Sequence, residues 1–334
     1  MRITPETLHK IARDTVARRT RTDRNLLSIY LHGSLLEDEP LFAGTADIDL
    51  VFVHDDGAVV EREIQRLTDE VHLDIAHHER SHYRRARTLR VHPWLGSTIS
   101  SCRILYDPQH FMDFTQASVR GQFNRPDNVL GRARSQADHA RQMWVSLDNL
   151  DGEAGIGDVN LYLRAVEHVA NAVASLSGPP LTERRFLLRF PARAEAVGHP
   201  GLYQGLLGLL GAPRVDTATL RDWLASWKAA YEAIPPEEAP ARLHPARCPY
   251  YSRAFEKILE GERPHDALWP VLRTWTQAVH LLPEGSESAS SWEGSFRQLG
   301  LYGDEFRARV AALDAYLDTV EEIMEDWARE KGAE

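Results

Sequence analysis

The chain has 334 residues, of which 43% are apolar and 26% charged, a composition typical of globular proteins and not of disordered or fibrous chains. This length suggests two domains of ordinary size. The net charge of −10 is concentrated late in the chain, because residues 1–150 hold 20 basic and 21 acidic side chains whereas residues 151–334 hold 19 and 28. An acidic second half argues against a nucleic-acid partner, since phosphate backbones are bound by basic surfaces.

The local sequence also argues against a cysteine-based scaffold and against a secreted or membrane protein. The cysteines, Cys102 and Cys248, belong to no CxxC pair, so neither a disulfide framework nor a zinc finger is expected. The first residues lack the apolar segment of a signal peptide, and the longest apolar stretch, near 202–210, is too short to cross a bilayer. We therefore expect a cytoplasmic protein with no membrane partner.

The first part of the chain alternates helix and strand signals. Thr4 and Pro5 are typical of a helix start. Alternating or continuous apolar runs predict about four strands, at 26–31, 47–53, 71–76 and 102–106. Further helices are predicted at 60–68 and 79–90. This order indicates a small mixed sheet within an α/β domain.

The second part has no convincing strand signal. Helices are predicted at 129–150, 158–177, 182–197, 216–233, 250–261, 264–281 and 303–330. Loops are predicted at the proline-rich stretch 234–249 and the Ser/Gly-rich stretch 283–295. The fold class is therefore predicted as α+β, with an α/β domain over 1–120 and an all-α domain over 121–334.

One acidic motif carries chemistry. Asp47 and Asp49 alternate with Ile48 and Leu50, so in a strand both carboxylates project from one face. Two neighbouring carboxylates on a half-buried strand repel each other and require a cation. Oxygen ligands of this kind suit Mg²⁺, which completes its shell with water and substrate phosphates.

Two further features are expected to complete this motif. Asp74 lies between apolar residues of a later strand and would supply a third ligand if the two strands are neighbours, which allows two metal ions. Gly33 and Ser34 directly follow the first strand. Glycine permits close backbone approach, and a helix N-terminus with a free hydroxyl can hold phosphate.

These residues, LHGS, ADIDLVFV and HLDIA, resemble the nucleotidyltransferase superfamily of DNA polymerase β type. The resemblance covers residues 26–76. It implies that Gly33 and Ser34 contact the nucleotide phosphates, that Asp47 and Asp49 bind nucleotide-associated Mg²⁺, and that Asp74 helps to hold a second Mg²⁺. It also implies attack of an acceptor hydroxyl on the α-phosphorus, with release of pyrophosphate.

A catalytic domain followed by a helical one further resembles the antibiotic nucleotidyltransferases of the aminoglycoside and lincosamide type. This implies transfer of a nucleoside monophosphate, AMP from ATP, to a small-molecule hydroxyl. The acidic second half would suit a cationic acceptor. In such proteins a Glu of the helical domain often serves as general base, a role for which Glu167 is the candidate, with a solvated or ion-paired Glu167 as the alternative.

Other hypotheses stay open. Phe306, Val310, Leu313, Leu317, Val320, Met324 and Trp327 follow a heptad spacing, which indicates either packing within the chain or a homodimer seam. The function could also be transfer to a protein or RNA acceptor. Alternatively, the chain could be an idle nucleotide-binding or antitoxin-like module.

Overall fold

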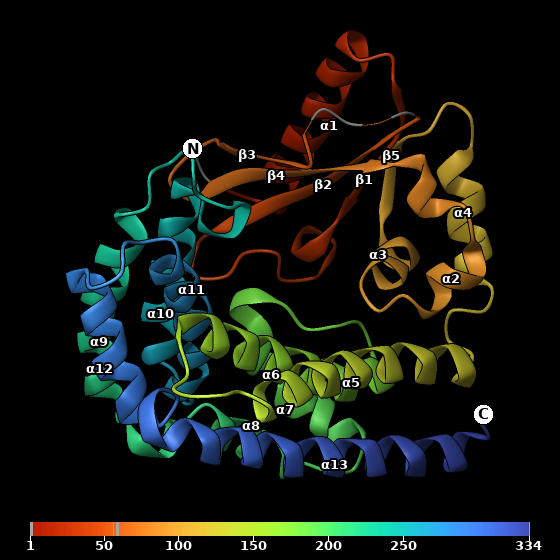
Figure 1. Ribbon diagram of the computed structural model, residues 1–334. Coiled ribbons are helices and arrows are strands. Elements are labelled where there is room, and N and C mark those ends of the chain that lie inside the picture. The colour runs from red at the N-terminus through yellow and green to blue at the C-terminus, as the bar shows by residue number, and fades with distance from the viewer. Residues whose placement is uncertain (1–2, 56, 58–59, 334) are drawn as a thin grey trace. The chain divides into compact units, whose positions relative to one another are not determined.

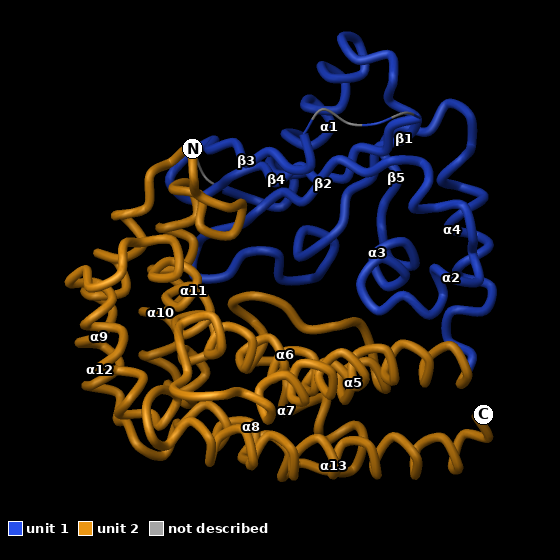
Figure 2. The backbone as a smooth tube through the Cα atoms, in the orientation of Figure 1, with its two compact units in different colours: residues 1–125 blue, residues 126–334 orange. Residues whose placement is uncertain are grey.

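The computed structural model describes residues 3–55, 57 and 60–333. The chain divides into two compact units, residues Met1–Arg125 and Pro126–Glu334, which we call unit 1 and unit 2 (Figure 2). The sequence places the boundary a few residues earlier, after residue 120. Each unit has its own secondary structure and core and is described by itself below.

Unit 1 combines one sheet with helices. Its elements are α1 (Pro5–Thr22), β1 (Leu26–His32), the 3-10 helix η1 (Gly33–Leu36), β2 (Ala46–His54), β3 (Arg62–Arg66), β4 (Val71–Glu79), η2 (Arg80–Tyr83), α2 (Ala86–Val91), α3 (Leu95–Ser101), β5 (Arg103–Tyr106) and α4 (Phe111–Arg120). Helix α1 begins as predicted, because the Thr4 hydroxyl accepts a hydrogen bond from the Thr7 amide and Pro5 occupies the first turn.

The sheet has five strands in the order β3-β4-β2-β1-β5 (Figure 1). Strands β2 and β4 run parallel, and the other neighbouring pairs are antiparallel. The sheet is thus mixed, as predicted.

Two predicted helices of unit 1 are wrong. A helix is predicted over 60–68, but Arg62–Arg66 forms the edge strand β3. A two-strand hairpin with β4 satisfies the backbone groups of this polar segment, and that pairing outweighs a weak helical pattern. Residues 58 and 59 lie outside the described residues. The predicted helix 79–90 is divided between the end of β4, η2 and the short α2.

The two faces of the sheet have different neighbours. On one face, Ile29, Ile48, Leu50 and Leu73 pack with α1 residues such as Leu8. On the other, Tyr30, Val51 and Val53 pack with residues of α2, α3 and α4. Figure 1 shows α1 and these three helices on opposite sides of the strands. Because side chains alternate along a strand, Asp47 and Asp49 lie on the face opposite α1.

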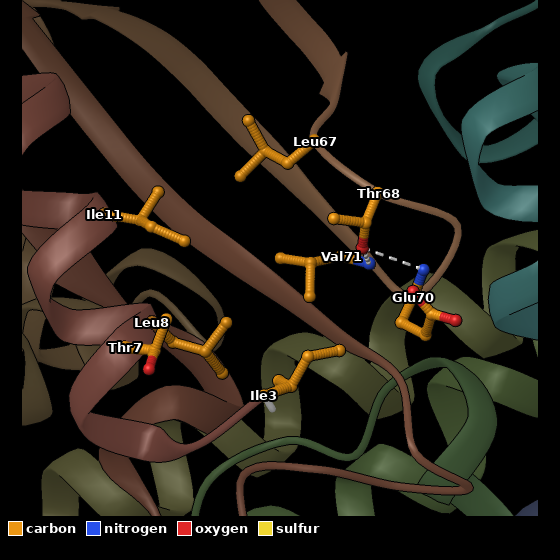
Figure 3. Close-up of a pocket in the computed structure, with 8 residues that line it drawn as sticks. All are labelled: Ile3, Thr7, Leu8, Ile11, Leu67, Thr68, Glu70 and Val71. Carbon is orange, nitrogen blue, oxygen red and sulfur yellow. Dashed lines mark hydrogen bonds between the residues drawn. The ribbon is translucent and has the colours of Figure 1, made fainter. Parts of the chain in front are cut away.

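A small cavity of about 80 Å³ lies under α1 (Figure 3). Its lining is mostly apolar and comes from α1 and the β3–β4 turn, where the Thr68 hydroxyl accepts hydrogen bonds from the Glu70 and Val71 amides. Val71 and Asp74 project from opposite faces of β4, and Val71 belongs to the apolar core of the α1 face. This cavity is therefore on the wrong side of the sheet to serve the acidic motif.

The described residues of unit 2 form helices and no strand. Its α-helices are α5 (Pro126–Asp148), α6 (Ile156–Ser177), α7 (Phe186–Ala196), α8 (Leu202–Leu209), α9 (Thr217–Glu232), α10 (Cys248–Leu259), α11 (Leu268–His280), α12 (Glu287–Leu299) and α13 (Phe306–Lys331). Short 3-10 turns connect several of them. The molecule is thus α+β in class, with an all-α second unit.

Helix α12 corrects the loop predicted over 283–295. Its serines and glycine are typical of loops, yet Ser286 caps the helix by accepting a hydrogen bond from the Ala289 amide. Trp292 and Phe296 are fully buried and stack on each other. Burial of two large aromatic side chains outweighs the weak helix propensity of the surrounding residues.

The heptad pattern near the C-terminus lies on α13. Its apolar positions from Phe306 to Met324 are buried, and α13 packs against α5 and α6 of the same unit. These apolar positions thus serve the core of unit 2, and a homodimer stays a prediction. No helix among the described residues is both long and apolar enough to cross a membrane.

Candidate active site

The three acidic residues of the motif lie on one face of the sheet. Asp47 and Asp49 belong to β2 and Asp74 to β4, and the parallel register places Asp49 directly beside Asp74. Paired residues of neighbouring strands project to the same side. Asp47 and Asp74 are only 7% and 3% exposed, while Asp49 is half-buried.

The turn after β1 approaches this group through Gly33. Gly33 has a φ of +77°, and a Cβ placed on it would lie 2.0 Å from Oδ2 of Asp49. Only glycine fits there, because any side chain would be strained and would collide with the carboxylate. The Gly33–Ser34 turn and Asp49 are therefore placed against each other by the fold.

The segment after Gly33 differs from the expectation. Gly33–Leu36 forms a four-residue 3-10 helix, whose Ser34 carbonyl accepts a hydrogen bond from the Glu37 amide. A single short turn does not provide the aligned peptide dipoles of an α-helix. Any phosphate contact here would have to come from the Gly33–Ser34 backbone and the Ser34 hydroxyl.

Arg62 is a member of this group that the sequence analysis missed. Its Nε and Nη2 donate to Oδ1 and Oδ2 of Asp74 at 2.6 and 2.7 Å, a bidentate ion pair. Arg62 was hidden because its segment was predicted as a helix. The turn at Thr68–Glu70 between two short segments of possible strand could have indicated a hairpin, and with it the position of Arg62.

Two histidines border the carboxylates. His32 is paired with Asp49 across β1 and β2, and His72 with Asp47 across β2 and β4. Burial lowers the pKa of His32 to about 4, against the opposing effect of Asp74 and Asp47. His32 is therefore neutral at pH 7 and adds no positive charge to the group.

The donor set fits Mg²⁺ in chemistry, since carboxylate oxygens are its preferred protein ligands. Asp47 and Asp49 would suffice for one ion that takes its other ligands from water and phosphate. Over residues 3–55, 57 and 60–333, however, no three His, Cys, Asp or Glu side chains are gathered closely enough to hold a metal. Asp74 is bound by Arg62 instead, so two-metal binding stays a prediction.

Glu167 lies on α6 of unit 2 and is largely buried. Its Oε2 accepts a hydrogen bond from Nη2 of Arg273 on α11 at 3.2 Å. Arg273 also donates to Asn160, about two turns earlier on α6, at 3.0 Å. Glu167 is thus ion-paired, which was the alternative to a catalytic role, and its action as a base stays a prediction.

Comparison with known proteins gives little support. No protein-family model and no curated protein matches the chain. Among solved structures it is similar to a nucleotidyltransferase-like protein from Exiguobacterium sibiricum 255-15, with 12% identity and a TM-score of 0.29 over 94% of this chain and 91% of that chain. That description agrees with the resemblance of the motif, but at this TM-score it carries no argument, and the function has to be argued from the carboxylates themselves.

Proposed function

We propose that the chain is a Mg²⁺-dependent nucleotidyltransferase that transfers AMP from ATP to a hydroxyl of a small, cationic, antibiotic-like acceptor. The observation that carries this proposal is the register that sets Asp49 beside Asp74, with Asp47 on the same face and Gly33 against Asp49. Carboxylate oxygens gathered on one half-buried sheet face are ligands that suit a divalent ion.

In this proposal Asp47 and Asp49 hold Mg²⁺ together with the phosphates, and Asp74 contributes to a second ion. When bound, Mg²⁺ would neutralise phosphate charge and lower the pKa of the acceptor hydroxyl. The Gly33–Ser34 turn would bind the triphosphate through its backbone and hydroxyl. The acceptor oxygen forms a bond to the α-phosphorus, the bond from that phosphorus to the β-phosphate oxygen breaks, and pyrophosphate leaves.

The hydroxyl proton needs an acceptor, and we propose Glu167 for this role. Its test is Glu167→Gln assayed over a range of pH. Loss of a base lowers kcat most and removes the acidic limb of the pH profile, whereas loss of a purely structural ion pair lowers stability and leaves the shape of that profile unchanged.

The decisive experiment for the function as a whole compares Asp49→Asn with the wild-type protein. Asparagine preserves shape and relieves repulsion with Asp47, so the melting temperature without metal should hold or rise. Transfer of label from ATP to a panel of cationic hydroxyl compounds should fall by about three orders of magnitude or more, since metal stabilisation of the transition state contributes several kcal/mol.

A binding measurement covers the case of an unidentified acceptor. ATP should raise the melting temperature of the wild type only with Mg²⁺, and this rise should vanish in Asp49→Asn. Asp55→Asn is the matched control, because Asp55 directly follows β2 but is exposed and paired with Arg80. If none of the four triphosphates produces a Mg²⁺-dependent shift in the wild type, the idle binding module replaces the enzyme as the better hypothesis.

A further inference from the structure

The ion pair between Arg62 and Asp74 places a protein cation on a candidate metal ligand. Both oxygens of Asp74 accept from the guanidinium, at 2.6 and 2.7 Å. A planar bidentate pair of this kind is among the strongest and most directional hydrogen-bonded contacts in proteins. The two oxygens that a metal ion would use are thus already engaged.

The partners differ sharply in exposure. The Arg62 side chain is 46% exposed, whereas that of Asp74 is 3% exposed. Arg62 begins β3, an edge strand that pairs only with β4 in the sheet. Its guanidinium can therefore move into water at little desolvation cost, while the buried Asp74 carboxylate requires a positive partner wherever Arg62 goes.

The guanidinium also lies within the electrostatic reach of the rest of the group. Arg62 contacts Asp74, and Asp74 is the register partner of Asp49 on β2. A divalent ion at Asp74 and Asp49 would occupy the region of Arg62's positive charge. A guanidinium and a divalent ion on the same carboxylate repel each other, so their binding is competitive.

We propose that Arg62 is a resident counter-ion of the candidate metal site, which holds Asp74 while no divalent ion is bound and releases it when one binds. This inference rests on the proposed function and adds a control on it: metal enters at Asp74 only by displacing an arginine of the same chain. The released guanidinium would then be available to an anionic group such as a phosphate.

The test is a Mn²⁺ titration of the full-length protein, with free Mn²⁺ measured by electron paramagnetic resonance and with neither nucleotide nor acceptor present. Arg62→Gln should bind Mn²⁺ about tenfold more tightly than the wild type, or better, because the competing charge-assisted pair is gone. Arg66→Gln is the matched control. It removes the same charge from the same strand, but Arg66 pairs with the exposed Asp69. The Mn²⁺ affinity of this variant should therefore equal that of the wild type.

A second variant keeps the test valid if Arg62→Gln does not fold. Arg62→Lys retains the charge but replaces the two-pronged contact by a single ammonium, so its Mn²⁺ affinity should lie between those of the wild type and Arg62→Gln. Equal or weaker binding by both variants would overturn the role of Arg62 and leave the nucleotidyltransferase proposal standing. Absence of Mn²⁺ binding by every variant and the wild type, with ATP as well as without, would overturn both proposals.

Discussion

The two units each contain a carboxylate bound by an arginine, and the two pairs behave differently. In unit 1, Asp74 is buried but Arg62 is 46% exposed at the sheet edge. In unit 2, Glu167 and Arg273 are only 14% and 7% exposed and join the packed helices α6 and α11. The first pair can open into water, whereas opening the second would leave two charges buried. The same chemistry thus provides a releasable contact in one unit and a permanent one in the other.

The surroundings of the two arginines reinforce this difference. Burial lowers the pKa of Arg273, and the nearby Glu167 opposes that shift. Arg273 is further fixed by its hydrogen bond to Asn160. Arg62, in contrast, extends from a strand with one neighbour. We therefore expect loss of the arginine to cost more stability in unit 2 than in unit 1.

The largest expected effect on stability is that of Arg273→Met. Removing one member of a buried ion pair leaves Glu167 without its hydrogen-bonded arginine, which should lower the free energy of unfolding by about 3–5 kcal/mol. Urea unfolding followed by circular dichroism measures this loss, and Mg²⁺ should not restore it. Arg329→Met, which removes an arginine with a 77% exposed side chain, is the control and should change little. Comparable small losses in both variants would contradict a permanent pair.

Arg62→Gln should have a smaller effect on stability, and one that depends on metal. Without divalent ions the buried Asp74 loses its bidentate pair with Arg62, at a cost of about 1–3 kcal/mol. Added Mg²⁺ should recover part of that loss in this variant and stabilise the wild type less. Urea unfolding with Mg²⁺ and with EDTA measures the stabilisation by Mg²⁺ in the variant and in the wild type. Equal stabilisation of the two proteins by Mg²⁺ would contradict the release of Arg62 from Asp74 by metal. The contrast between the two ion pairs would then fail.

Gly33→Ala separates backbone strain from contact with Asp49. Its control is Gly44→Ala, because Gly44 also has positive φ, +72°, but a Cβ there meets nothing within 4 Å. Both changes should cost about 1–2 kcal/mol of stability from left-handed backbone geometry. Gly33→Ala should cost more than Gly44→Ala, because its Cβ would also collide with Asp49. Only Gly33→Ala should also abolish the Mg²⁺-dependent thermal shift with ATP. Equal nucleotide responses would reduce Gly33 to an ordinary turn residue.

The smallest effect concerns pH and tests the surroundings of Arg273. Burial, with His139, Arg164 and Arg273 nearby, lowers the pKa of His168 to about 4. Between the unfolded pKa near 6.5 and about 4, the unfolded chain binds more protons at this site, so stability falls as pH falls through that window. His168→Gln should flatten this part of the plot of the urea unfolding midpoint against pH. An unchanged slope would show that His168 is not held neutral by its surroundings.

The local part of the candidate site could be predicted from the sequence. The alternation of polar and apolar residues along 47–53 predicts that Asp47 and Asp49 share a face. The two-residue period of side chains in a strand is a property of the strand's own backbone. The position of Gly33 directly after a strand likewise pointed to a turn with close backbone approach. The class of the fold followed from similar patterns, which extend over five to twenty residues.

Which segments pair was decided only by tertiary structure. Strand β3 exists because Arg62–Arg66 can hydrogen-bond to β4, and that pairing alone brings Arg62 onto Asp74. Glu167 and Arg273 lie 106 positions apart and meet because α6 and α11 pack together. Local sequence sets the geometry of each element through backbone dihedrals and side-chain alternation. Ion pairs between distant residues depend instead on register and packing, which are fixed by burial of apolar side chains over the whole unit.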